Sequence, residues 1–78
     1  MSNLDKYTKV FTGVFEISKE QTSNLKYQSI PTWDSIGHMG LIAGLESEFK
    51  ITLEPDDIVD LSSFEKGKEI LQKYKIEI

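Results

Sequence analysis

The strongest constraint on the fold is the spacing of the apolar residues, which recur every three or four positions in several short segments. In the first segment, from Asn3 to about Glu16, these positions follow the period of one helical face. They are Leu4, Tyr7, Phe11 and Val14, widened by Val10 and Phe15. No segment of any length alternates apolar and polar residues, which is the pattern of a β-strand. The spacing therefore predicts an all-α protein.

A second helix is predicted from Ser35 to Phe49. Either Asp34 or Ser35 can cap its start, because a short oxygen-bearing side chain accepts a hydrogen bond from an unpaired amide of the first turn. One apolar stripe is expected to face the core, and it consists of Met39, Ile42, Leu45 and Phe49, with Leu41 beside it. Three glycines within this helix lower its intrinsic stability and allow another backbone or a partner to come close.

The segment from Ser18 to Thr32 is polar and rich in turn-forming residues, so we expect a long loop. Its length exceeds that of an ordinary connection, and ordered loops of this length are often functional. Three apolar residues are expected to anchor it to the core, namely Leu25, Tyr27 and Ile30.

A short third helix is expected to begin at Pro55, because proline suits the first turn of a helix. The residues Ser62 to Glu65 have the spacing of a capping box, which predicts the start of a last helix. Its expected buried side chains are Phe64, Ile70, Leu71 and Tyr74. The whole pattern predicts a small four-helix bundle with a long first loop and a short third helix, in one domain of residues 1–78.

The composition excludes several classes of function. Nine lysines against thirteen acidic residues give a net charge of −4, whereas a general nucleic-acid binder needs a basic surface. The absence of cysteine excludes a disulfide scaffold, a thiolate metal site and a cysteine nucleophile, and a single histidine excludes a multi-histidine metal site. In a chain of 78 residues, we do not expect an enzyme with its own deep pocket.

The apolar runs also bear on location. None is long enough to cross a membrane, and the first ten residues lack the apolar core of a secretory signal. We therefore expect a cytoplasmic protein. Nothing in the sequence indicates a large apolar patch, so a monomer is expected.

The acidic residues are concentrated in one part of the chain. Between Asp34 and Asp60 there are seven acids and one lysine, whereas the remainder has eight lysines and six acids. Such a segment can be an ordinary solvated surface. It can also be a docking surface for basic patches on partner proteins, where charge guides the encounter.

Asp34, Ser35 and His38 contain the three residue types of a hydrolase triad. However, their spacing of three and four residues places them on one helical surface. That arrangement provides no oxyanion donors opposite the serine and no walls that exclude water. We therefore expect no catalysis by this chain itself.

The segment around Ser35 resembles a known family. Asp34-Ser35-Ile36 is similar to the Asp-Ser-Leu motif of acyl and peptidyl carrier proteins, with isoleucine in place of leucine. The similarity continues through WDSIGHMGLIAGLESEF, the link 51–53 and the acidic turn 56–58. It covers essentially the whole chain and is most specific from Trp33 to Asp60. The fold that this resemblance implies is the four-helix bundle of acyl-carrier type.

The resemblance also implies a prosthetic group. Ser35 would receive 4′-phosphopantetheine from coenzyme A, added by a separate magnesium-dependent phosphopantetheinyl transferase. The thiol of that group would carry an acyl or aminoacyl cargo as a thioester, which fits a chain without cysteine because the cofactor supplies the sulfur. The protein would present this cargo to acyl- or aminoacyl-loading enzymes and to downstream transferases and synthases, which would dock on the second helix.

Seven residues are expected to contribute to partner recognition on this basis. They are Asp34, Ile36, Met39, Ala43, Glu46, Asp56 and Asp57. Core packing is an equally good interpretation of Met39. Trp33 could either stack within the loop or cover the attached arm.

The chain also departs from the family pattern. Gly37, Gly40 and Ser47 stand where acids or larger residues are common, and the acids are shifted toward Glu54 to Asp60. This favours a specialised biosynthetic pathway over housekeeping fatty-acid synthesis. Two alternatives stay open, namely an aminoacyl or peptidyl carrier and an acidic helical interaction module without any prosthetic group.

Overall fold

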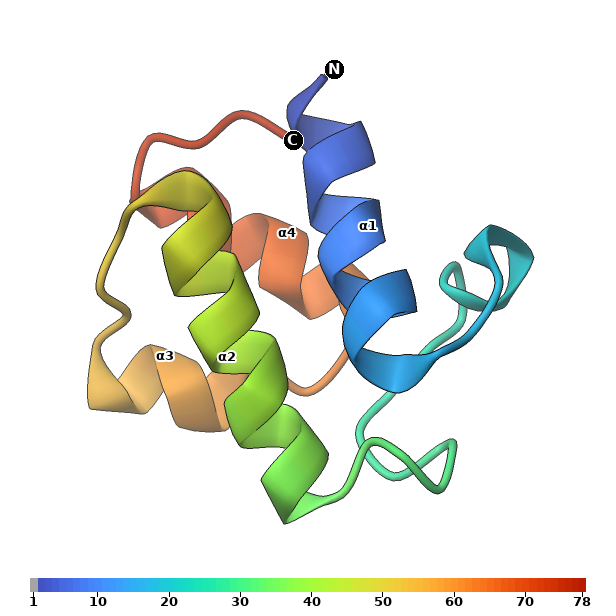
Figure 1. Cartoon of the computed structure of the whole chain (residues 1–78). Coiled ribbons are helices and arrows are strands. Elements are labelled where there is room, and N and C mark those ends of the chain that lie inside the picture. The colour runs from blue at the N-terminus through green and yellow to red at the C-terminus, as the bar shows by residue number, and fades with distance from the viewer. Residues whose placement is uncertain (1) are drawn as a thin grey trace.

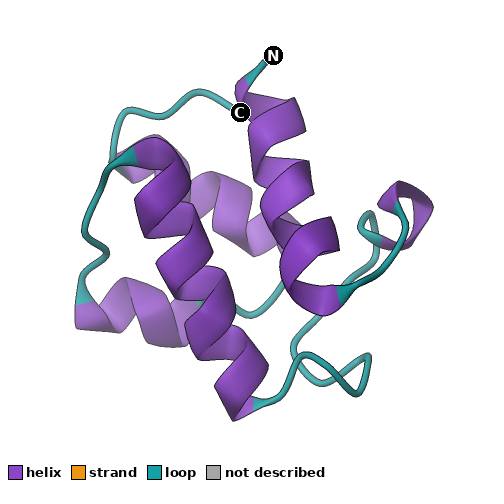
Figure 2. Cartoon of the chain, in the orientation of Figure 1, coloured by secondary structure: helices purple, strands orange, loops and turns teal. Residues whose placement is uncertain are grey.

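The computed structural model describes residues 2–78, and within them it contains four α-helices, one short 3₁₀ helix and no strand (Figures 1 and 2). The elements are α1 (Asn3–Phe15), η1 (Lys19–Gln21), α2 (Ser35–Phe49), α3 (Pro55–Asp60) and α4 (Phe64–Lys73). The predicted all-α class, the long first connection and the short third helix are thus confirmed. None of the helices in these residues has both the length and the apolar character that a membrane crossing requires.

The core is built around aromatic side chains. α1 and α2 run in opposite directions and pack against each other, with α4 behind them (Figure 1). The ring of Phe11 on α1 lies 4.9 Å from the rings of Tyr7 and Phe64 and 5.7 Å from Trp33, measured between centroids. Tilted and edge-to-face pairs at such distances add to the free energy of burying the rings.

The start of α2 depends on close backbone packing. A Cβ atom added to Gly37 would lie 1.9 Å from the carbonyl oxygen of Thr32, so only glycine allows the first turn to approach the preceding loop. The Thr32 hydroxyl in turn donates to the carbonyl oxygen of Phe15 at 3.2 Å. These contacts bring the end of the loop, the end of α1 and the start of α2 together.

The long loop is anchored differently from the prediction. Leu25 is buried and Ile30 half-buried, as expected, but Tyr27 is 37% exposed and lies at the surface. Backbone pairing provides an anchor instead, because the amide of Tyr27 donates to the carbonyl oxygen of Ser62 and the amide of Phe64 donates to that of Leu25. The loop is therefore tied to the start of α4 by main-chain hydrogen bonds.

The cap of α4 lies one residue later than the predicted box of residues 62–65. The Ser63 hydroxyl, rather than that of Ser62, accepts the hydrogen bond from the amide of Lys66, at 2.9 Å. The predicted buried residues Phe64, Ile70 and Leu71 are buried, and Tyr74 is half-buried. Because both serines precede the apolar stretch, spacing alone did not distinguish them.

Candidate functional site

The hydroxyl of Ser35 is free at the start of α2. Asp34 is the N-cap, and its carboxylate accepts the hydrogen bond of the Gly37 amide at 2.8 Å. This decides between the two predicted caps and leaves Ser35 in the first helical position, exposed. Its hydroxyl has no hydrogen-bond partner among residues 2–78.

Beside Ser35 lies an apolar groove of about 420 Å³. Its lining comes from the loop, from α2, from α3 and from the segment before α4, and it consists of Tyr27, Ser35, His38, Met39, Ile58, Val59, Leu61 and Ser62. No lysine or carboxylate is among these residues. Large apolar side chains at its edge stay in solvent, since Met39 is 56% and Val59 80% exposed. An exposed apolar patch of this kind is typical of a binding surface.

Met39 therefore does not belong to the buried stripe of α2. The stripe predicted from the helical period is buried at Ile42 and Leu45, half-buried at Phe49, and open at Met39. The core interpretation of Met39 is wrong, because its side chain is largely exposed and lines the groove together with Ile58 and Val59 of α3.

His38 is half-buried between the loop and α3. Its Nδ1 lies 3.0 Å from the indole Nε1 of Trp33, and its Nε2 lies 2.7 Å from the carbonyl oxygen of Ile58. Both ring nitrogens are therefore engaged away from Ser35, and the carboxylate of Asp34 caps the helix. Asp34, Ser35 and His38 are therefore not joined by hydrogen bonds between their side chains.

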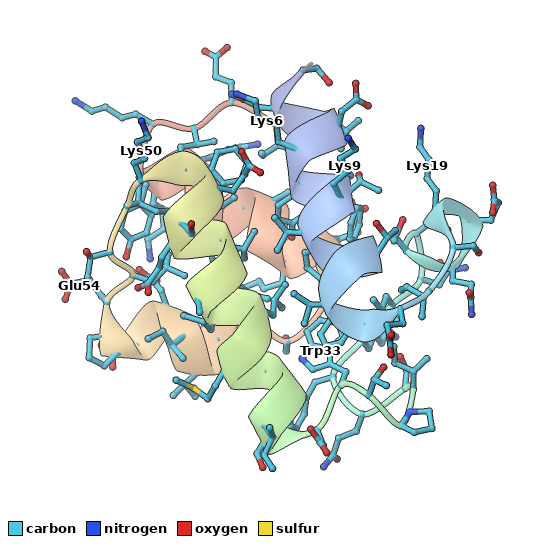
Figure 3. The ribbon with its side chains drawn as sticks, viewed as in Figure 1. Lys6, Lys9, Lys19, Trp33, Lys50 and Glu54 are labelled. Carbon is cyan, nitrogen blue, oxygen red and sulfur yellow. The ribbon has the colours of Figure 1, made fainter. Side chains whose placement is uncertain are left out.

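Trp33 packs in the core as well as against the loop, and the core packing was not predicted. Its side chain is fully buried and lies beside the last turn of α1, stacked on Phe15 with the ring centroids 5.1 Å apart (Figure 3). It does not line the groove, but its ring lies edge-to-face with that of Tyr27 in the loop, 6.3 Å between centroids, so the loop interpretation is correct in part. It is part of the core, and its indole N–H donates to the ring of His38.

The residues expected to recognise partners differ in how accessible they are. Ile36 is 82% exposed, and Ala43 and Asp56 are also exposed. Glu46 is half-buried, and one of its carboxylate oxygens accepts a hydrogen bond from the amide of Leu53 at 2.9 Å. It therefore helps to hold the link between α2 and α3.

Asp57 is the exception, since it is only 4% exposed. Its carboxylate accepts from Lys73 Nζ and from the Tyr74 hydroxyl, each at 2.5 Å. The hydrogen bond from Lys73 lowers the pKa of Asp57, and the one from Tyr74 acts in the same direction. The carboxylate is thus engaged between α3 and α4 and is not available to a partner, contrary to the expectation from the acidic turn.

Several groove residues were missed by the sequence argument, in particular Tyr27, Ile58, Val59 and Ser62. The sequence carried no signal for the pair on α3. Adjacent helical residues can both be buried, as Ile70 and Leu71 are on α4, so the neighbouring Ile58 and Val59 did not indicate a surface groove.

Comparison with models of protein families, with curated protein sequences and with solved structures finds no match to this chain. The site combines an unpartnered hydroxyl at the positive end of a 15-residue helix with an adjacent uncharged groove. A helix N-terminus favours an anion close to it, and an apolar groove favours an uncharged chain.

Proposed function

We propose that this protein is a carrier protein of the acyl-carrier type, modified at Ser35 with 4′-phosphopantetheine and without catalytic activity of its own. The four helices would then be the bundle of acyl-carrier type that the sequence resemblance implies. One observation carries the proposal: the hydroxyl of Ser35 is exposed and unpartnered at the first turn of α2, directly beside an apolar groove. A phosphodiester attached there would lie at the positive end of the helix dipole.

The attachment is a transfer of phosphopantetheine from coenzyme A to Ser35. The bond that forms joins Ser35 Oγ to the phosphorus next to the pantetheine, and the bond that breaks is the pyrophosphate linkage of coenzyme A. Adenosine bisphosphate leaves, and the hydroxyl proton goes to a base of the transferase, since His38 has no free ring nitrogen to accept it. When attached, the group supplies a thiol that holds the cargo as a thioester.

An uncharged acyl cargo fits the groove better than an aminoacyl cargo. The groove lining contains no carboxylate, so the ammonium group of an aminoacyl thioester would have no ionic partner there. Its apolar side chains, Met39, Ile58, Val59 and Leu61, instead provide a surface for a hydrocarbon chain. An aminoacyl or peptidyl carrier is the second candidate, with its cargo held outside the groove.

The partners follow from the accessible surface near Ser35. The transferase, the loading enzyme and the downstream transferase or synthase would approach a surface with Ile36 and Ala43 exposed on α2 and Asp56 on α3. Acidic residues of the segment from Asp34 to Asp60 would guide basic partner surfaces to it. We propose that the protein acts as a monomer in a specialised pathway.

The test is the intact mass of the purified protein before and after incubation with coenzyme A, magnesium and a broad-specificity phosphopantetheinyl transferase. We expect a gain of one phosphopantetheinyl group, which Ser35→Ala abolishes. The matched control is Ser47→Ala, an exposed serine on the same helix, which should leave the gain unchanged.

A folded protein that gains nothing with several transferases would overturn the proposal. The remaining candidate would then be an unmodified acidic interaction module. In that case Ser35→Ala would leave binding of a protein partner intact, whereas the carrier function requires the hydroxyl.

A further inference from the structure

The hydrogen bonds of His38 define its protonation state. The indole N–H of Trp33 can only donate, so His38 Nδ1, 3.0 Å away, is the acceptor and carries no hydrogen. The carbonyl oxygen of Ile58 can only accept, so His38 Nε2, 2.7 Å away, carries the hydrogen and donates it. His38 is therefore a neutral imidazole with its proton on Nε2.

The bond to Ile58 satisfies the end of α3. The last four carbonyl groups of a helix have no partner within the helix, and α3 has only six residues. Ile58 lies in its last turn, so His38 supplies from α2 a hydrogen bond that α3 cannot make itself. A side-chain N–H near a helix C-terminus is also favoured by the helix dipole.

α3 has little apolar packing of its own to hold it in this place. Asp57 is its only fully buried residue, and that carboxylate is bound toward α4 by Lys73 and Tyr74. On the side of the groove, Ile58 is half-buried and Val59 is largely exposed. The hydrogen bond from His38 thus joins α3 to α2 at the wall that α3 contributes to the groove.

The ring of His38 is itself held in position from the loop. It stacks on the buried indole of Trp33, with the planes inclined by 13° and the centroids 6.2 Å apart. The ring of Tyr27, which also comes from the loop, is nearly perpendicular to it, at 5.6 Å between centroids. The loop, α2 and α3 therefore meet at one side chain, three residues after Ser35.

We infer that His38 is a positioning residue for the site at Ser35: as a neutral Nε2–H imidazole it holds α3 against α2 and thereby keeps the groove wall beside the serine in place. The inference rests on the proposed function for the nature of the group at Ser35. The placement of α3 by His38 does not depend on that function and is tested separately.

Three substitutions separate the two hydrogen bonds. In His38→Gln, the side-chain amide can take the place of Nε2 and donate to Ile58. In His38→Asn, the shorter amide can take the place of Nδ1 and accept from Trp33, but does not reach Ile58. His38→Leu removes both bonds. The free energy of unfolding of each variant is measured first, so that only folded proteins are compared.

The structural arm uses the unmodified protein. A proton–nitrogen correlation spectrum of the His38 ring at neutral pH should show a hydrogen on Nε2 and none on Nδ1. Amide exchange in α3 should be about three- to tenfold faster in the Leu and Asn variants, the factor that one net hydrogen bond represents, and close to wild type in the Gln variant. A hydrogen on Nδ1, or α3 exchange that is unchanged in both Leu and Asn, would overturn the inference.

The functional arm uses the kinetics of the transferase with each variant as substrate. The KM for the Leu and Asn variants should rise by a similar factor of about three to ten with kcat little changed, and Gln should restore it. Gln behaving like Leu would contradict the inference even if Ser35 is modified. If the wild-type protein gains no group, the proposed function fails, while the spectrum and α3 exchange still decide the role of His38.

Discussion

The first turns of α2 and its central turns lie in different kinds of surroundings, and the contrast shows how a 78-residue chain divides its apolar residues. Leu41, Ile42 and Leu45 belong to the core, in which Phe11 touches four other rings. Near Ser35, by contrast, Ile36 and Met39 remain in solvent. Burial of the first group stabilises the fold, whereas exposure of the second costs free energy that binding of a ligand or partner can recover.

The contrast extends to the way in which the helices are held. α1 and α4 contribute large buried rings, whereas α3 is tied by one hydrogen bond before its start and by another in its last turn. The amide of Glu54 donates to the Tyr74 hydroxyl at 2.8 Å before α3 begins, and His38 reaches Ile58 in its last turn. A segment held by a few directional bonds can open locally without unfolding the aromatic core.

The largest expected effect comes from removing the central ring. Phe11→Ala should lower the free energy of unfolding by about 3–5 kcal/mol, because it deletes buried surface and leaves a cavity among rings that cannot collapse onto it. The measurement is urea unfolding followed by circular dichroism. Val59→Ala, on the exposed side of α3, is the control and should change the value by less than about 0.5 kcal/mol. Similar losses in both variants would abolish the distinction between the two regions.

Two glycine substitutions should have opposite signs. Gly37→Ala places a methyl group 1.9 Å from the Thr32 carbonyl oxygen, so we expect a loss of about 1–3 kcal/mol as the first turn of α2 is displaced. Gly13→Ala meets no atom within 4 Å and should stabilise the protein by up to about 1 kcal/mol through the higher helix propensity of alanine. Denaturant midpoints at constant m-value would check both. A Gly37→Ala protein as stable as wild type would show that the loop at Thr32 can move to accommodate the methyl group without loss of stability.

A smaller loss is expected at the cap of α2, next to the serine. Asp34→Ala should cost about 1 kcal/mol, because the amide of Gly37 loses its acceptor. Ser35→Ala should change the free energy of unfolding by less than about 0.5 kcal/mol, because the Ser35 hydroxyl makes no hydrogen bond within residues 2–78. Thermal unfolding of the two variants measures both changes in stability, and so distinguishes the capping role of Asp34 from the role of Ser35 as a modification site. A large destabilisation by Ser35→Ala would mean that the hydroxyl has a structural role.

The most local effect should be the response of α3 to acid. The pKa of Asp57 is lowered in the folded protein, so its contribution to stability is complete above the ordinary pKa of an aspartate, about 4, and is lost as the pH falls through the lower folded value. The protection of α3 amides, relative to their intrinsic exchange rates at each pH, should therefore fall in acid before the protection of α1 amides does. Tyr74→Phe removes one donor to that carboxylate and should move this loss of protection to higher pH. A simultaneous loss of protection in α1 and α3 would show that α3 has no independent opening.

Much of the helical arrangement was predictable because its determinants are local. The bounds of α2, the short α3 that begins at Pro55 and most of the buried faces of α1 and α4 follow from apolar spacing and from residues that start helices. Leu4, Tyr27 and Met39 were mistaken for buried residues because periodicity identifies a face of a segment but not which part of that face a neighbour covers; Leu4 is 42% exposed. Asp57 was mistaken for a recognition residue because its partners, Lys73 and Tyr74, are 16 and 17 residues away.

The sequence by itself determined the all-α class, the order of the four helices, the bounds of the second and the serine at its start, since these depend on residues within a few positions of one another. Only the tertiary structure decided that Asp34 is the cap, that Trp33 lies in the core, that Asp57 binds α4 and that His38 joins α2 to α3. The groove beside Ser35 belongs to this second group, because its walls come from segments that meet only when the chain is folded.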